Sequence, residues 1–172
     1  FLSDDKFTVS YNGLVQGFVS YHDFTPQRYL SLNNKMITTN DSISLWEHGI
    51  GEYQTYYDTY YPMSVTVLAN PDPDNFKIFN NLIYTSEVYI NDIDQPLVTF
   101  NNLRVWNEFQ NTGLVDITDK AKRRYRIWAV PIPRHNGTRD RIQNQWTYIK
   151  LEFNNNENNY KIVLHDLNLN YI

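Results

Sequence analysis

The residue types that most often carry chemistry in proteins are sparse in this chain of 172 residues. Its four histidines, His22, His48, His135 and His165, lie far apart in sequence, and none has another histidine at a spacing typical of metal ligands. The chain has no cysteine, which excludes disulfides, thiol nucleophiles and cysteine-ligated zinc. A Gly-x-Ser-x-Gly motif and a glycine-rich phosphate loop are also missing. We therefore expect no catalytic residue, no metal and no cofactor.

Two pairs of carboxylates are close in sequence, Asp72 with Asp74 and Asp92 with Asp94. Two carboxylates facing each other across a cleft would allow glycoside hydrolysis, so a capsule-degrading glycosidase stays open as one interpretation. Both pairs lie beside Pro or Asn in segments typical of turns, where aspartate side chains usually cap backbone groups. A calcium loop would also need a terminal glutamate, which neither segment supplies. The sequence therefore favours a structural role for these four residues.

Tyrosines gather in residues 53–61, which hold five of the chain's 14 tyrosines. Tyrosine offers a wide, rigid contact area with a polar tip, so this stretch predicts either a protein–protein contact patch or the packing of a loop against a sheet. Stacking against a sugar would use the same side chains, which keeps a carbohydrate-binding β-sandwich for host attachment as an alternative. The candidate contact residues are Tyr56, Tyr57, Tyr60 and Tyr61.

The charge of the chain is strongly uneven along the sequence, although the net charge is only −4. Residues 1–119 carry 5 basic and 15 acidic side chains, whereas residues 120–141 carry 8 basic and 1 acidic. Such a basic segment would pair with an acidic surface of an adjacent subunit, or with the phosphates of DNA. The excess of acidic residues elsewhere favours the first interpretation. The candidate contact residues are Arg123, Arg124, Arg126, Arg134 and Arg141.

Strands joined by turns are the elements that must position these residues. Alanine is nearly absent, whereas tyrosine, asparagine, threonine, valine and isoleucine are frequent, which is typical of strands and turns. We expect one hairpin with a tight turn at Asn12-Gly13 and another across residues 28–38. Residues 124–130 alternate in the manner of a strand with one basic face. No sustained apolar pattern with a period of 3.6 residues occurs, so we expect little helix.

Turn signals spaced about 8–12 residues apart predict an all-β fold of antiparallel sheets, arranged as a β-sandwich or as propeller-like blades. We expect residues 1–172 to form a single module. The sequence starts at Phe1 without an initiator methionine or a leader, which suits a piece of a longer polypeptide as well as a truncated preparation. No apolar run of about 18 residues occurs, so we expect no membrane span.

Several short motifs follow one another in order along nearly the whole chain. They include Ser20-Tyr21-His22-Asp23-Phe24-Thr25-Pro26, Leu45-Trp46-Glu47-His48-Gly49, Arg124-Tyr125-Arg126-Ile127-Trp128 and Pro131-Ile132-Pro133-Arg134. In this order they resemble segments of the muzzle proteins of crAss-like bacteriophages, a family also known as tail stabilization proteins. The motifs carry no catalytic meaning, so the resemblance depends on their number and order.

The resemblance implies a structural role in the virion, similar to that of the tail nozzle of short-tailed phages, and no enzymatic activity. It implies a homo-oligomeric ring, commonly hexameric, at the far end of the phage tail, through which DNA leaves. It also implies that the partners are other tail proteins and exiting DNA, and that residues 1–172 are the C-terminal segment of a longer chain. On this interpretation the tyrosines build subunit contacts, while the arginines pair with acidic surfaces or line the DNA path.

Overall fold

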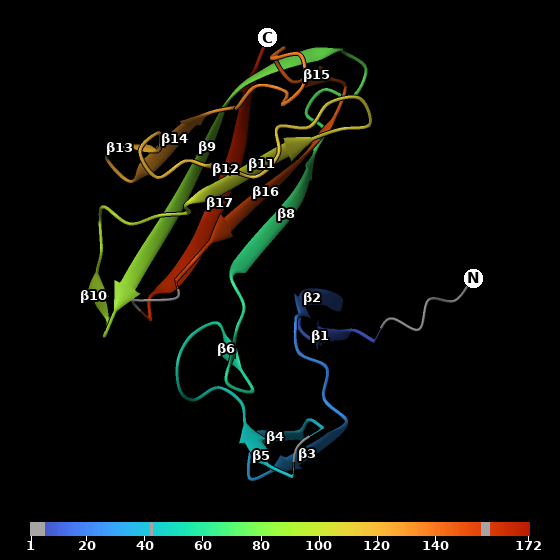
Figure 1. Ribbon diagram of the computed structural model, residues 1–172, viewed down its shortest axis with the longest axis vertical. Coiled ribbons are helices and arrows are strands. Elements are labelled where there is room, and N and C mark those ends of the chain that lie inside the picture. Colours follow the sequence, from blue (N-terminus) through green and yellow to red (C-terminus); the bar gives the residue numbers. More distant parts are fainter. Residues whose placement is uncertain (1–5, 42, 156–158) are drawn as a thin grey trace. The chain divides into compact units, whose positions relative to one another are not determined.

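The computed structural model describes residues 6–41, 43–155 and 159–172. Within these residues every regular element is a β-strand and every pair of strands is antiparallel, which confirms the predicted all-β fold class. The chain divides into two compact units, the first ending at Tyr61 and the second spanning Pro62–Ile172 (Figure 1). No helix in the described part of the chain is able to cross a membrane.

The first unit begins with a hairpin that joins β1 (Thr8–Asn12) to β2 (Gly17–His22). Asn12 pairs directly with Gly17, so the loop spans residues 13–16 and the predicted tight turn at Asn12-Gly13 is wrong. The Asn12 side chain instead accepts a hydrogen bond from the backbone N–H of Leu14 at 2.8 Å. The positive φ of the loop, 52°, belongs to Gln16. Asparagine therefore acts here through its capping side chain and not through its tolerance of positive φ.

The rest of the first unit consists of short strands. The predicted second hairpin is present, and its turn residues Asn33 and Asn34 have φ of 50° and 62°. Phe24, which is 3% exposed, is the one large apolar side chain counted as buried among the described residues of this unit. The strands are β3 (Arg28–Leu32), β4 (Lys35–Thr39), β5 (Leu45–Glu47), β6 (Thr55–Tyr56) and β7 (Thr59–Tyr60).

The second unit is built from two antiparallel sheets (Figure 1). The long strand β9 is the centre of the first sheet, and all but one of the other strands of this sheet pair with it directly. The strands of this sheet are β9 (Lys77–Ile90), β10 (Ile93–Asp94), β13 (Lys122–Arg124), β14 (Ile127–Pro131), β15 (Gln143–Asn144) and β17 (Lys161–Tyr171). The second sheet has the order β12 (Val115–Asp116), β11 (Asn102–Trp106), β16 (Thr147–Phe153) and β8 (Met63–Ala69).

The two sheets share one hydrophobic core, as in a β-sandwich. Along β16 the side chains alternate strictly between buried and half-buried positions, as expected for a strand with one face on the core. Fully burying a large apolar side chain stabilises a fold by about 1.5–3 kcal/mol, so this cluster holds the second unit together. The core side chains supplied by strands are Phe79, Leu82, Tyr84, Val88, Trp128 and Val130 from the first sheet and Leu103, Val105, Ile149, Leu151 and Phe153 from the second.

The alternation of side chains predicted a continuous strand across residues 124–130, and this prediction is wrong. Strands β13 and β14 form a hairpin in which Arg124 pairs with Ile127, so Tyr125 and Arg126 are its turn residues. Tyr125 has φ 58°, at the turn position that glycine usually occupies in such two-residue hairpin loops. This left-handed residue breaks the period of two. The basic run therefore surrounds the tip of a hairpin instead of covering one face of a strand.

Candidate assembly surfaces

The tyrosine-rich stretch forms the β6–β7 hairpin and packs around Phe24. The Tyr56 ring centroid lies 4.4 Å from that of Phe24, and the Tyr57 ring meets Phe24 edge-on at 5.9 Å. Tyr61 lies 6.2 Å from Tyr56, and the Tyr60 hydroxyl donates a hydrogen bond to the side chain of Gln54 at 2.9 Å. All four candidate tyrosines are half-buried. They supply much of the packing of the first unit, and their role as a contact patch between subunits stays a prediction.

A small polar network lies against these rings. The Thr38 hydroxyl hydrogen-bonds the Nε2 atom of His48 at 2.6 Å and the hydroxyl of Tyr57 at 2.7 Å. Burial lowers the pKa of His48, and nearby His22 lowers it further. Burial also raises the pKa of Tyr56, with a smaller effect from Asp23. His48 and Tyr56 are therefore neutral at pH 7, which suits the packing of an aromatic cluster.

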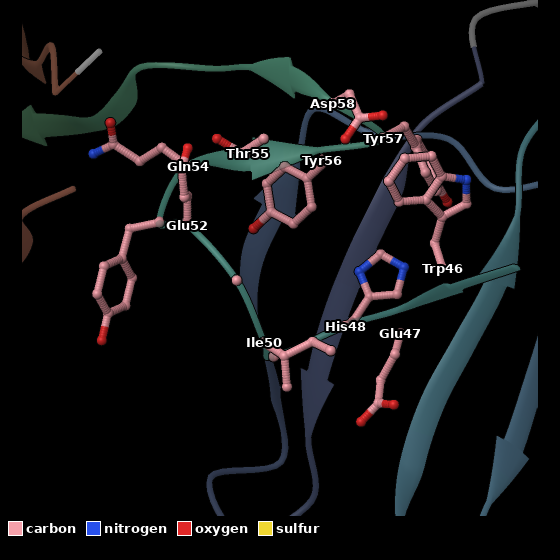
Figure 2. Close-up of a pocket in the computed structure, with 13 residues that line it drawn as sticks. Trp46, Glu47, His48, Ile50, Glu52, Gln54, Thr55, Tyr56, Tyr57 and Asp58 are labelled. Carbon is pink, nitrogen blue, oxygen red and sulfur yellow. The ribbon is translucent and has the colours of Figure 1, made fainter. Parts of the chain in front are cut away.

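A cavity of about 510 Å³ opens beside this cluster and is lined by residues 46–58. Figure 2 shows that the rings of Trp46, His48 and Tyr56 surround part of it, together with the acidic side chains of Glu52 and Asp58. Aromatic rings beside carboxylates are the groups that the carbohydrate-binding alternative requires. No group of three metal-ligating side chains occurs in this cavity or elsewhere among the described residues.

The hairpin of β1 and β2 turns its polar side inward and its aromatic side outward. Buried Thr8 donates a hydrogen bond to the carbonyl of Phe24 at 2.6 Å, and Ser10 hydrogen-bonds His22 on the same side. The rings on the opposite side contact one another in pairs but are 59–80% exposed, and they belong to Phe7, Tyr11, Phe18 and Tyr21. Exposed apolar patches of this kind commonly mark contact surfaces. None of these four residues was among the sequence candidates.

The β13–β14 hairpin brings three of the candidate arginines together. Arg124 and Arg126 are exposed and flank Tyr125, which is 86% exposed at the tip. Arg123 is half-buried: its guanidinium lies 5.8 Å from the centroid of the Trp128 ring and donates a hydrogen bond to the carbonyl of Pro96. Arg123 therefore stabilises its own unit, whereas the side chains of Arg124 and Arg126 are exposed at the surface.

The candidate arginines have no carboxylate partner in the part of the chain that the structure describes. None of Arg123, Arg124, Arg126, Arg134 and Arg141 forms a salt bridge within residues 6–41, 43–155 and 159–172. Hydrogen bonds from Tyr89 and His165 lower the pKa of Glu87, and the charge of Arg126 adds to that effect. Arg126 therefore lies near the carboxylate of Glu87, and it forms no salt bridge with any carboxylate that the structure describes.

Arg134 and Arg141 lie in the connection between β14 and β15, away from the hairpin tip. The Arg141 guanidinium donates a hydrogen bond to the side chain of Asn80 at 3.0 Å. Asn80 and Glu87, the neighbour of Arg126, are seven residues apart on β9, or about 23 Å at 3.3 Å per residue. The structure therefore separates Arg141 from the arginines of the hairpin.

Three of the four carboxylates that suggested catalysis or calcium binding lie in turns, whereas Asp94 lies in strand β10, opposite Tyr89. Asp72 has φ 55°, its side chain accepts a hydrogen bond from Asn75, and its carbonyl accepts one from the Lys77 ammonium at 2.6 Å. Asp92 has φ 62° in the turn that joins β9 to β10. These geometries suit aspartate as a turn residue.

Two comparisons with known proteins agree on one family. Residues 51–135, which include the β6–β7 and β13–β14 hairpins, match the family described as Crassvirus muzzle protein C-terminal domain. Over 169 residues, or 94% of this chain, the sequence is 32% identical to the muzzle protein of Bacteroides phage crAss001. The match spans 12% of the length of that relative. The chain therefore belongs to the muzzle protein family of crAss-like phages, as the order of its motifs predicted.

Proposed function

We propose that this chain is a structural component of the phage virion and serves as an all-β module of the tail muzzle. Its 32% identity to the muzzle protein of Bacteroides phage crAss001 supports this role. The module provides oligomeric contacts in a ring, commonly hexameric, at the tail end through which DNA leaves. Its partners are further copies of the same protein and other tail proteins, and it has no enzymatic role.

The tip of the β13–β14 hairpin is the observation that carries the contact role. Two exposed arginines flank an exposed tyrosine there, and no carboxylate of the described residues pairs with Arg124 or Arg126. Tyrosine and arginine are the residue types enriched in protein interfaces and in the positions that contribute most to binding. A charged group left unpaired in its own chain gains most from a partner that supplies the opposite charge.

The first unit carries an excess of the opposite charge. Residues 1–61 carry 3 basic and 7 acidic side chains, a net charge of −4. The basic tip of one copy would meet the acidic first unit of the next copy. Such a head-to-tail contact between two different surfaces closes into a ring when its rotation angle divides the circle. The exposed aromatic side of the β1–β2 hairpin would add apolar area at the same contact.

Charge reversal at the hairpin tip tests this proposal. We expect the double variant Arg124→Glu, Arg126→Glu to weaken oligomers of the chain at least tenfold, because it replaces attraction by repulsion. Raising the salt concentration should weaken the wild-type oligomers in the same direction, since exposed charges are screened. Light scattering coupled to size-exclusion chromatography gives the oligomer mass, and circular dichroism checks the fold.

Two control variants separate assembly from folding and from net charge. Arg124→Lys with Arg126→Lys keeps both charges and should retain most of the assembly, whereas Arg139→Glu reverses an exposed charge in the connection between β14 and β15. Assembly that is unchanged in the Arg→Glu variant would contradict the proposed contact. Normal assembly combined with a steep, salt-dependent loss of DNA binding would instead assign these arginines to the DNA path.

A further inference from the structure

Among the strands that the structure describes in the second unit, β8 is the edge that lacks the usual protection against pairing. Proteins usually blunt sheet edges with short strands, charged residues, prolines or bulges, because an open edge pairs with other chains. The edge strands β10, β12 and β15 have two residues each, and β13 consists of three basic residues. The pairing of β17 with β9 is interrupted by two register shifts. β8 instead has seven uncharged residues in regular register with β16, and no described strand pairs with its outer edge.

The backbone groups that β8 leaves open can be identified from its neighbours. The Glu152 carbonyl accepts a hydrogen bond from the backbone N–H of Asn101, so the backbone groups of Glu152 point toward β11. Val105 exchanges hydrogen bonds with Thr112, so the backbone groups of Val105 point away from β16. Val105 is opposite Ile149, so the backbone N–H and C=O groups of Ile149 point toward β8. Glu152 is opposite Ser64, so the backbone groups of Ser64 point away from β16, toward the open edge. Alternation along the strand then directs the N–H and C=O groups of Ser64, Thr66 and Leu68 outward.

The side chains of β8 are self-complementary about Thr66. In an antiparallel pair centred on this residue, Thr66 faces Thr66 of the other copy and Ser64 faces Leu68. The half-buried side chains of β8 would all lie on the core face of the joined sheet in both copies. They are Met63, Val65, Val67 and Ala69. No like charges meet, and opposed threonines are a favourable cross-strand pair. Each of the three outward-facing pairs would exchange two backbone hydrogen bonds.

We propose that β8 pairs in antiparallel fashion with β8 of a second copy of this chain, so that two four-stranded sheets join into one continuous sheet. This inference goes beyond the proposed function and does not depend on it. A two-fold contact uses the same surface on both copies and joins only two of them, so neighbours in one head-to-tail ring cannot form it, and it joins either two free copies or copies from two different rings.

A lysine at the centre of the contact tests the proposal. The Thr66 side chain is exposed, so Thr66→Lys should leave the fold intact while it places two positive charges opposite each other across the two-fold axis. We expect this variant to weaken the dimer about fivefold or more, and Thr66→Glu to do the same. An equimolar mixture of the two variants should restore dimers, because lysine then faces glutamate. Thr66→Val, which keeps shape and neutrality, should dimerise like the wild type.

Sedimentation velocity of the 172-residue chain and its variants measures the dimers, and amide hydrogen exchange locates the contact. The amides of Ser64, Thr66 and Leu68 should be protected in the wild-type dimer and exposed in Thr66→Lys. A wild-type chain that stays monomeric at about 0.1 mM would overturn the proposal, as would dimers that are insensitive to charge at position 66. Protection of these amides in a monomer would assign the edge to another segment of the same chain, which also overturns it.

Discussion

Tyr84 is the residue whose ionisation the fold opposes most clearly. Its side chain is 1% exposed in the core of the second unit, and its hydroxyl accepts a hydrogen bond from Thr99 at 3.0 Å. Burial raises the pKa of Tyr84 to about 12, although the hydrogen bond from Thr99 acts in the opposite direction. In the unfolded chain the same hydroxyl ionises near pH 10, so between these values the unfolded state releases a proton that the folded state retains.

This difference in pKa predicts that the second unit loses part of its stability, the part linked to Tyr84, as pH rises from about 10 to about 12. Tyr84→Phe should remove that part of the alkaline loss and cost about 1 kcal/mol at neutral pH, because one buried hydrogen bond disappears. Denaturant unfolding of the wild type and the variant between about pH 8 and pH 12 measures both effects. Tyr29→Phe, at a tyrosine that is 59% exposed, is the control. Parallel pH curves for wild type and Tyr84→Phe would refute this explanation.

The types of the candidate residues were predictable at this scale, but their surroundings were not. The composition singled out Tyr56 and Tyr57, yet only the structure places both rings against Phe24. The sequence also could not separate Arg123, which lies over Trp128, from exposed Arg124 beside it. The first outcome depends on Phe24, which is far away in sequence. The second depends on the hairpin turn that brings Trp128 opposite Arg123, and side-chain spacing alone does not reveal that turn.

At the scale of the elements, the turn of the β13–β14 hairpin determines what the basic segment presents. Alternation of side chains predicted strands such as β16, because one face of such a strand is buried in the core. Alternation did not predict the break at Tyr125, since its left-handed backbone is a property of the turn and not of the period. The β1–β2 hairpin, whose polar side is buried and whose aromatic side is exposed, also could not be predicted from alternation. A period of two shows that the two faces of a strand differ, but it does not show which face is buried.

Because Tyr125 has a left-handed backbone, we expect a substitution at this position to change the stability of the fold and the strength of assembly in different directions. Tyr125→Gly relieves an unfavourable conformation, which costs roughly 1 kcal/mol for a side chain with a Cβ atom, so we expect the melting temperature to stay the same or rise. The same change removes an exposed aromatic ring from the proposed contact and should weaken oligomers several-fold. Calorimetry and light scattering measure the two effects. A loss of stability without a change in assembly would show that Tyr125 serves its own hairpin.

At the scale of the whole molecule, two units with different surfaces lie in one chain. The first unit is acidic and exposes aromatic rings, whereas the second has a well-packed sandwich core, a basic hairpin tip and one open sheet edge. The small net charge of −4 therefore comes from the opposition of acidic and basic regions. The fold class and the family followed from the sequence, because strand patterns and ordered motifs are local. The division of the chain into two units at Tyr61 did not follow from the sequence, since it depends on which segments pack together.

The central claim is that this chain is part of the phage tail, and its position in intact particles tests that claim most directly. Purified particles would be labelled with an antibody raised against residues 62–172 and viewed by electron microscopy, with peptide mass spectrometry of the same particles as a check. We predict that the label gathers at the end of the tail farthest from the capsid and that peptides of this chain are abundant. Particles that lack these peptides, or that carry the label on the capsid, would contradict the proposed function.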